Sequence, residues 1–537
     1  MLPRPPRGGQ TASGSQPNLN NNNNNMVHKR NYPFEEGRSD SKVAKICEIS
    51  FRPLIQKVFP DSEILKLKVR IGTMPGDNFT SVIYAVEALL KSSVQITVSG
   101  QTGDLKTGAR VSDQVNSTDP SQTQVLHLIM KCFPNHPARQ DFFRKIDIFR
   151  KELDVYRFLL PELIQFEKQR FPLSNDSQRW GLLSAFPHFY GGAYGDDYNR
   201  YWEHYNNGQI AHGNFILVED LRKTQGYRMA SKYVGLDLPH CSLVVQEIAK
   251  LHALSMAYIK VKLENSSSLS DHFDCLKETI VTPQTEEVAS TLFNASFLTS
   301  VEIVKQETGC DSIYSQKMRQ FGNQVHWIFG HILAGNTDMS LEEMLKIKPN
   351  FEDLHDQNKT RKRNNWYVLT HGDCYVNNIL FKYEPKTNQP ISVKLVDFQL
   401  ARENCLTIDL VNFIYLSTTQ NFRQENLNKV LQVYYHSFIE YCRELGVEPY
   451  DDFSMGNLKR KFHHAKIWGM INSLFVLPVV LADAADEQFP LDRAAAGEEL
   501  NASQMFDQLL KQGSKRNEKL ATRVVQLVQE MAEEGVI

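Results

Sequence analysis

Two polar motifs on a predicted β-hairpin constrain this chain more than any other feature of its sequence. A His-Gly-Asp motif ends at Asp373, and Asn378 comes five residues later. Residues 378–383 and 391–397 both have the composition of strands, and the segment between them is rich in turn formers. Asp397 closes the second of these predicted strands, nineteen residues beyond Asn378. The hairpin is therefore expected to hold two carboxylates and an amide close together.

This combination of side chains suits phosphoryl transfer. Asp373 would orient a hydroxyl nucleophile, and with an ordinary Asp pKa it would take the hydroxyl proton late. Asn378 and Asp397 offer the hard oxygen ligands that Mg²⁺ needs when it bridges nucleotide phosphates. Either motif alone also occurs as an ordinary turn or strand end, but their combination predicts a nucleotide-dependent phosphotransferase.

Hydrophobic periodicity divides the chain into a strand-rich first part and a mostly helical second part. The segments typical of strands are residues 64–71, 81–86, 123–133 and 214–219, and those typical of helices are 41–59, 142–169, 240–263, 285–307, 314–333 and 424–445. We therefore predict an α+β, bilobal fold, with a strand-rich N-lobe, a mostly helical C-lobe and a ligand-binding cleft between them.

Composition sets the predicted boundaries. The expected units are a disordered tail at 1–40, an N-lobe at 41–218, and a C-lobe at 219–537 that carries the catalytic hairpin at 366–397. The tail is rich in Pro, Gly, Ser and Asn, so it cannot bury enough apolar surface to offset chain entropy. Two polar, turn-rich segments, 99–122 and 191–212, are predicted insertions into the N-lobe.

Charge and cysteine content argue against several classes of function. The 537 residues include 60 Lys+Arg and 62 Asp+Glu, so the formal net charge is only −2 and nucleic acid is not an expected partner. The eight cysteines include no C-x-x-C pair and fit neither a zinc knuckle nor a disulfide framework. The most apolar window, residues 467–482, is interrupted by Asn472 and Pro478 and is too short to span a membrane. We expect a cytoplasmic protein with no membrane partner, and its oligomeric state is left open.

The run H-G-D-x-x-x-N-N-I-L-F at 371–381, followed by V-D-F-Q at 396–399, resembles the ecdysteroid kinase-like family. This family, also called CHK kinase-like, belongs to the protein-kinase-like superfamily and is related to choline kinases and aminoglycoside phosphotransferases. Segments 149–161 and 249–253 are similar to helices of that family. The chain departs from the family pattern at Tyr375, where a Trp is expected.

The resemblance implies a nucleotide site and a protein-kinase-like fold. Lys131 would hold the α- and β-phosphates of ATP, and Glu152 would orient Lys131. The remaining residues implied in nucleotide binding are the phosphate-loop positions Gly76, Asp77, Asn78 and Ser81, and Glu219 and Leu221 of a linker at 217–221 whose backbone would bond adenine.

Two further residues near the motifs are expected to support the catalytic loop. His371 is expected to bond backbone and hold Asp373 in place rather than act as a base or metal ligand. Asp409 opens a predicted helix, where it would cap the helix or brace the loop. Only residues 398–408 separate Asp397 from that helix, and no A-P-E motif follows. A protein kinase needs a longer segment to dock a peptide, so a small-molecule acceptor is expected.

The sequence therefore predicts an ATP- and Mg²⁺-dependent kinase of a small-molecule alcohol, and the family suggests an ecdysteroid or a xenobiotic alcohol. One alternative is a choline- or ethanolamine-like kinase, which would need an acidic or aromatic cage for its cationic acceptor. Another is a pseudokinase that binds nucleotide without turnover. The pseudokinase is disfavoured by the joint presence of five residues: Lys131, Glu152, Asp373, Asn378 and Asp397.

Overall fold

The computed structural model describes residues 51–72, 81–92, 122–133, 143–171, 181, 185–195, 214–265, 267–322, 324–333, 336, 339–349, 366–481 and 518–537. Several sequence predictions fall largely outside these residues: the tail at 1–40, the segment 99–122 apart from its last residue, the segment 191–212 beyond residue 195, and the phosphate-loop residues Gly76, Asp77 and Asn78. The first ten residues of the helix predicted at 41–59 also lie outside them.

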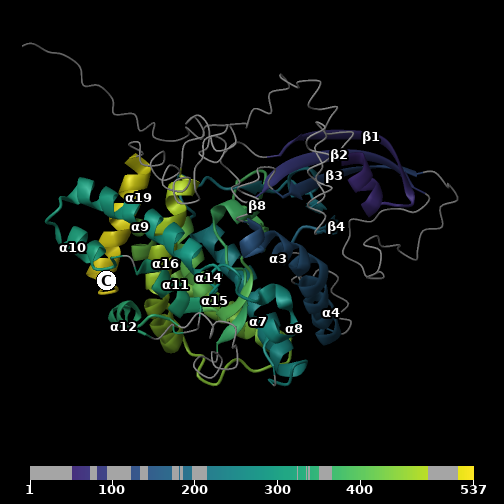
Figure 1. The fold of residues 1–537 in the computed structure, drawn as a ribbon. Helices are drawn as coiled ribbons and strands as arrows, with labels where there is room; N and C mark the ends of the chain where they lie inside the picture. Colours follow the sequence, from purple (N-terminus) through teal and green to yellow (C-terminus); the bar gives the residue numbers. More distant parts are fainter. Residues whose placement is uncertain are drawn as a thin grey trace, which may run out of the picture.

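The N-terminal part of the molecule is a five-stranded antiparallel sheet (Figure 1). Its strands are β1 (Ser62–Ile71), β2 (Val82–Ser92), β3 (Gln122–Cys132), β4 (Phe189–Ala193) and β5 (Phe215–Glu219), in the order β1-β2-β3-β5-β4. Alternate side chains of the strands, such as Leu67 and Leu128, form one core with Phe51 of a helix at residues 51–58. Lys131 lies opposite Ile83 of β2 and Ile216 of β5, in the middle of the sheet.

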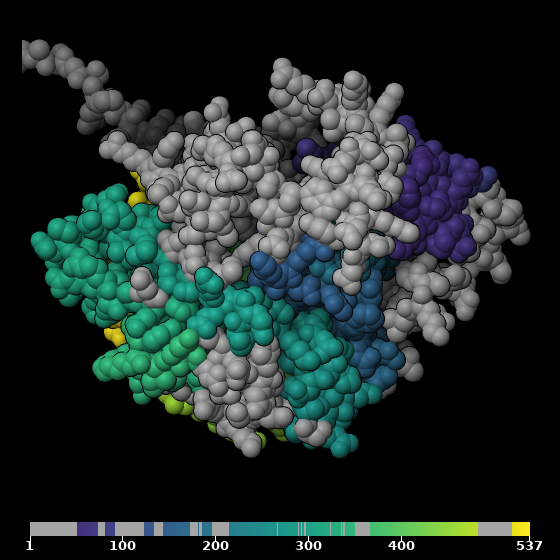
Figure 2. Space-filling model, viewed as in Figure 1, coloured from purple at the N-terminus to yellow at the C-terminus, as the bar shows by residue number. Residues whose placement is uncertain are grey.

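A helix that follows β3 connects the sheet to the helical part. It consists of α3 (Ile148–Asp154), one π-helical turn at Val155–Leu159 and α4 (Leu160–Arg170). In Figure 2 the blue surface of these residues lies between the purple strands and the teal surface of the helical part. Phe149 and Leu153 are buried in the apolar core shared with the C-terminal helices. This packing fixes the helix that carries Glu152.

The rest of the described chain is mostly helical. After β5 it passes through α6 (Leu221–Thr224) and β6 (Arg228–Met229) into α7 (Leu238–Val261). The other α-helices are α8 (Leu269–His272), α9 (Glu286–Thr308), α10 (Ile313–Arg319), α11 (Val325–Leu333), α12 (Leu341–Lys346), α14 (Thr407–Ser417), α15 (Gln420–Glu444), α16 (Met455–Val480) and α19 (Glu518–Glu533). The predicted α+β, two-lobed organisation is confirmed. None of the described helices combines the length and apolar character that crossing a bilayer requires.

Short strands in the helical part carry the polar motifs. They are β7 (Tyr367–Thr370), β8 (Ile379–Tyr383), β9 (Pro390–Leu395) and β10 (Arg402–Cys405), with a 3-10 turn at Val376–Asn378. β8 pairs with β9 and β6, as the predicted hairpin requires, and β7 pairs with β10. Asp397 does not close the second strand as predicted, because β9 ends at Leu395 and Asp397 has a φ of +72°.

Two other sequence predictions differ from the structure. The helix predicted at 314–333 is two helices, α10 and α11, and Gly322 between them has a left-handed φ of +52° that interrupts the helical backbone. Residues 191–193, predicted as the start of an insertion, form the end of β4, so any insertion in this region begins after Ala193.

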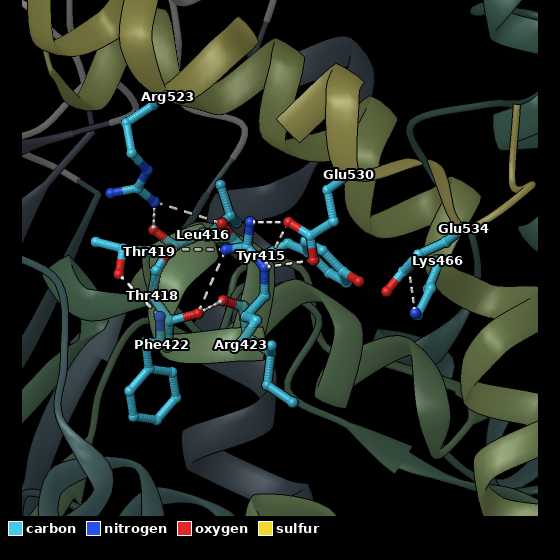
Figure 3. Close-up of polar contacts among 11 residues, drawn as sticks. Tyr415, Leu416, Thr418, Thr419, Phe422, Arg423, Lys466, Arg523, Glu530 and Glu534 are labelled. Carbon is cyan, nitrogen blue, oxygen red and sulfur yellow. Dashed lines mark hydrogen bonds and ion pairs between the residues drawn. The ribbon is translucent and has the colours of Figure 1, made fainter. Parts of the chain in front are cut away.

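The C-terminal helix α19 is fixed by charged side chains (Figure 3). Arg423 of α15 donates to both carboxylate oxygens of Glu530 at 2.5–3.1 Å, and both side chains are buried. The same guanidinium donates to the carbonyl of Thr418 at 2.8 Å. Arg523 of α19 donates to the carbonyl of Leu416 at 3.4 Å, near the end of α14. These contacts attach α19 to the junction of α14 and α15.

Candidate functional site

Lys131, Glu152 and Asp397 meet where the sheet faces the helical part. The Lys131 Nζ lies 2.6 Å from Glu152 Oε2 and 2.9 Å from Asp397 Oδ1. Burial by itself would lower the pKa of Lys131, but the two carboxylates outweigh burial and raise it above its ordinary value. Lys131 is therefore a fixed cation held by a carboxylate from each part of the molecule.

The conformation of Asp397 depends on the packing of its neighbour Phe398. Phe398 is fully buried, with its ring edge-to-face to Phe186 at 5.1 Å and to Tyr156 at 5.9 Å between centroids. Its other neighbour is the His371 ring at 4.5 Å. An anchored ring directly after Asp397 helps to hold that residue in a left-handed conformation that few side chains adopt.

Asp373 receives hydrogen bonds from two amide side chains. Asn378 Nδ2 donates to Asp373 Oδ2 at 3.0 Å and to the Asp373 carbonyl at 2.9 Å, and Gln399 Nε2 lies 3.4 Å from the same Oδ2. Burial, with the nearby charge of Asp397, raises the pKa of Asp373 to about 7. The sequence-based assumption of an ordinary Asp pKa is wrong, because that assumption took no account of burial.

His371 supports the loop through backbone contacts, as predicted. Its Nε2 lies 3.1 Å from the carbonyl of Val396, and its Nδ1 lies 3.3 Å from the backbone N–H of Asp373. A carbonyl can only accept and an N–H can only donate, so the neutral tautomer with its proton on Nε2 satisfies both. Burial lowers the pKa of His371, in agreement with a neutral ring.

Asp409 braces the same loop but does not cap a helix. Helix α14 begins at Thr407 after Leu406, so Asp409 lies inside its first turn. Its fully buried carboxylate accepts from the backbone N–H of His371 at 2.7 Å and of Gly372 at 2.9 Å. His252 of α7 approaches the same carboxylate at 3.1 Å. The brace that we predicted for Asp409 is confirmed, and the alternative of a cap is wrong.

Gly372 allows the loop to pass close to the segment after Asp397. It has a φ of +79°, and a Cβ atom added to it would lie 2.0 Å from the carbonyl oxygen of Leu400. Only glycine fits both the conformation and the space. The loop that carries Asp373 and the turn that carries Gln399 are therefore in direct contact.

Asn412 ties this loop to helix α16. Its Nδ2 donates to the carbonyl of Gly372 at 3.3 Å. Its Oδ1 accepts from Trp468 Nε1 at 2.8 Å and from Asn472 Nδ2 at 3.0 Å. Side chains from α7, α14 and α16 thus converge under the His-Gly-Asp motif.

Asn378 and the segment before Asp397 lie side by side. The backbone N–H of Val396 donates to the carbonyl of Asn378 at 3.0 Å. Amide and carboxylate oxygens are suitable ligands for Mg²⁺, which keeps waters and phosphate oxygens as its remaining ligands. Within the described segments, no cluster of three or more His, Cys, Asp or Glu side chains could hold a metal ion alone.

The linker residues Glu219 and Leu221 mostly contact other groups of the protein. The Glu219 N–H donates to the carbonyl of His188 at 2.9 Å, and its carboxylate accepts from Thr224 Oγ1 at 2.5 Å. Leu221 forms a small apolar cluster with Tyr227 and Leu380, against which Val396 packs. Of the phosphate-loop residues only Ser81 is described, as a buried residue just before β2.

Sequence reasoning gave no role to Gln399 or Asn412 and did not pair His252 with Asp409. Gln399 directly follows the Val-Asp-Phe motif, and this position could have marked it as a residue of the site. His252 and Asn412 carry no local signal, because their partners lie more than 35 residues away in the sequence.

Comparison with protein families matches this chain to a known family. The sequence model described as the ecdysteroid kinase-like family matches residues 75–447, which is more than half of the chain. No curated protein matches the chain.

Solved structures give only weak similarities. The GDP complex of wild-type aminoglycoside 2'-phosphotransferase-IIIa aligns with a TM-score of 0.33 and 11% identity, over 88% of this chain and 99% of its own. A point mutant of that enzyme, also with GDP, aligns with a TM-score of 0.34 and 10% identity, over 90% of this chain and 97% of its own. An ethanolamine kinase from Plasmodium vivax aligns with a TM-score of 0.33 and 10% identity, over 89% of this chain and 95% of its own. The family match carries the assignment.

Proposed function

Because this chain belongs to the ecdysteroid kinase-like family, we propose that it is an ATP- and Mg²⁺-dependent kinase that phosphorylates a hydroxyl of a small molecule. The fold is the α+β, bilobal fold of protein-kinase-like phosphotransferases, which fits this activity. The observation that carries the proposal is the ion pair of Lys131 with both Glu152 and Asp397. Residues far apart in the sequence thereby combine in the arrangement that phosphoryl transfer needs.

The proposed nucleotide site lies between the lobes, whose boundary we place at residues 218 and 219. Lys131 would bind the α- and β-phosphates of ATP and Glu152 would keep its ammonium in place. The phosphate loop at residues 76–81 would cover the phosphates. The apolar side chains of Leu221 and Leu380 suit the adenine face. Since the N–H of Glu219 is already bonded to His188, backbone groups further along the linker would bond the adenine edge.

Asn378 and Asp397 are the residues that would hold Mg²⁺. Asn378 donates through its Nδ2 to Asp373, so its Oδ1 is the atom that a metal would meet. Asp397 shares one oxygen with Lys131 and has a second oxygen for the metal. When bound, Mg²⁺ would neutralise charge on the phosphates.

Asp373 is the proposed base. Its Oδ2 accepts from two amides, and among the described residues its Oδ1 has no hydrogen-bond partner, so Oδ1 can accept from the acceptor hydroxyl. In the transfer the hydroxyl oxygen bonds to the γ-phosphorus, the bond to the leaving ADP oxygen breaks, and the hydroxyl proton passes to Asp373. A pKa of about 7 suits this step at neutral pH.

The connection after Asp397 supports a small-molecule acceptor. It forms β10, paired with β7 from Arg402 to Cys405, and enters α14 at Thr407. Little chain remains to dock a peptide. From the family we propose an ecdysteroid or a xenobiotic alcohol as the acceptor.

The test is phosphate transfer from labelled ATP to three acceptor sets: casein-like proteins, choline-type amines and polyhydroxylated steroids. We expect a phosphate monoester on a steroid hydroxyl by mass spectrometry, and none with Asp373→Asn. Label in protein alone would refute the small-molecule acceptor. Label in choline alone would favour a choline-type kinase, and tight ATP binding without any transfer would favour a pseudokinase.

A further inference from the structure

Gln399 directs its side-chain amide at the proposed base. Its Nε2 lies 3.4 Å from Asp373 Oδ2, the oxygen that also accepts from Asn378 at 3.0 Å. In this contact the NH₂ group of Gln399 is the donor and Asp373 Oδ2 is the acceptor. The Oε1 atom of Gln399 is then the amide atom that does not contact Asp373.

The turn that carries Gln399 is held on both sides. Phe398 before it is fully buried among aromatic rings. The carbonyl of Leu400 after it lies against Gly372, and Arg402 pairs with Thr370 across β10 and β7. Gln399 is therefore positioned by the fold before any ligand binds, which lowers the entropy cost of using it in recognition.

The Oε1 atom of Gln399 has no hydrogen-bond partner among the described residues. Gln399 is 7% exposed as a whole. Within the described part of the chain its Oε1 has no hydrogen-bond partner, yet it is not among the fully enclosed polar atoms without partners. A buried side chain that keeps one accessible acceptor atom beside a catalytic carboxylate is suited to bind the substrate.

We propose that Gln399 is an acceptor-binding residue that selects alcohols with a second hydroxyl next to the one that is phosphorylated. This inference rests on the proposed function. Asp373 Oδ1 and Gln399 Oε1 are two acceptor atoms on neighbouring side chains, and each would accept an O–H at about 2.7 Å. A vicinal diol supplies two such donors on adjacent carbons. A monohydroxy alcohol leaves Oε1 unpaired, and the trimethylammonium group of choline has no hydrogen to donate.

The test compares matched acceptors that differ in one hydroxyl. The pairs are ecdysone with 2-deoxyecdysone, compared for phosphate on the 3-hydroxyl alone, and cis-cyclohexane-1,2-diol with cyclohexanol. For the wild type we expect kcat/KM to favour each diol by about tenfold or more, as in sites built to bond a substrate hydroxyl. Gln399→Met retains the length and packing of the side chain and removes its amide. It should reduce the preference to about twofold or less by lowering the value for the diol.

Controls separate recognition from folding. Gln389 is exposed in the turn between β8 and β9, so Gln389→Met should retain the wild-type preference. The Kd for ATP with Mg²⁺ should be unchanged in Gln399→Met. An absence of diol preference in the wild type would overturn the inference. So would an equal fall in kcat/KM for both members of a pair, or a preference for ethanolamine over the diols.

A binding measurement distinguishes failure of the inference from failure of the proposed function. Ligand-observed NMR with a non-hydrolysable ATP analogue and Mg²⁺ measures the affinity of each acceptor without turnover. If no alcohol is phosphorylated but the wild type binds the diols more tightly and Gln399→Met does not, the proposed function fails and only the recognition of a vicinal diol by Gln399 stands. If neither member of either pair binds, the inference is overturned.

Discussion

His252 on α7 and Asp409 on α14 form a 3.1 Å hydrogen bond in which neither side chain has any exposed surface. The other bonds of the Asp409 carboxylate come from the backbone of the His-Gly-Asp motif. The loop that carries the proposed base is therefore hydrogen-bonded to a carboxylate that is buried in the core of the helical part.

Asp409→Asn should weaken this support, because an amide NH₂ would face a backbone donor. A buried donor without a partner costs about 1–3 kcal/mol, so the free energy of unfolding should fall by about that amount. Urea denaturation measures the change, with Asp311→Asn on the exposed surface as the control. Equal stability of the Asp409 variant and the wild type would show that the brace contributes little.

Asp373→Asn should lower kcat by at least ~10² while the Kd for ATP changes little. The substitution retains the shape of the side chain and removes the atom that takes the hydroxyl proton. Steady-state kinetics with a phosphorylated acceptor and a nucleotide-binding titration measure both quantities. Turnover near the wild-type level would exclude Asp373 as the base.

Asp397→Asn should raise the Mg²⁺ concentration needed for half-maximal ATP binding by about tenfold or more, because a charged ligand is lost. Asn tolerates a left-handed backbone, so the φ of +72° at this position should be retained. The measurement is an ATP-binding titration at several Mg²⁺ concentrations, with Asp451→Asn on the exposed surface as the control. An unchanged dependence on Mg²⁺ would contradict the metal assignment.

Gly372→Ala should be far more damaging than Gly322→Ala, although both glycines have a positive φ. At Gly322 no atom of the described residues beyond the adjacent positions lies within 4 Å of an added Cβ, whereas at Gly372 the carbonyl oxygen of Leu400 lies at 2.0 Å. The Gly322 variant should lose about 1 kcal/mol from backbone strain alone. The Gly372 variant must also separate the loop from its neighbour, so it should lose more stability and most activity. Thermal unfolding and turnover of both variants give the comparison, and similar losses would contradict it.

Lys151 should make stability rise with pH above neutrality. It is buried on α3, donates to the carbonyl of Lys277 at 2.8 Å, and burial lowers its pKa to about 8 from 10.5. Between these values the unfolded chain binds more protons than the folded one, so the free energy of unfolding increases with pH. From pH 7.5 to 9.5 the wild type should gain about 2 kcal/mol relative to Lys151→Met.

Other groups titrate in the same range, so the difference between wild type and variant is the relevant quantity. Lys429→Met, at an exposed position on α15, should show no such change with pH. A constant difference between Lys151→Met and wild type across this range would contradict the lowered pKa.

The parts of the site that are contiguous in the sequence were the most predictable. Asp373, Asn378 and Asp397 lie on one hairpin region, where short motifs and strand patterns specify the local structure. The contact of Lys131 with Glu152 followed from family resemblance. The pKa of Asp373 could not be predicted, because it depends on burial in the assembled site. The left-handed turn at Asp397 could not be predicted either, because the composition of residues 391–397 is typical of a strand.

Tertiary contacts explain the remaining differences. The contact between Gln399 and Asp373 brings together residues 26 positions apart, through the pairing of β7 with β10. The break between α10 and α11 arises at Gly322, where the hydrophobic pattern continues and only the backbone conformation changes. Periodicity records which face of an element is buried and carries no information about such turns.

The bonds of Asn412 to Trp468 and Asn472 have an evolutionary consequence. Both partners lie on α16, beyond residue 447, where the match to the family ends. An alignment of homologues restricted to the matched region would omit side chains that bind Asn412, which in turn bonds the loop of the His-Gly-Asp motif. Divergence at these two positions would change the loop while every family motif stayed intact. When the acceptor of one homologue is used to predict the acceptor of another, the residues of α16 should therefore be compared as well as the motifs.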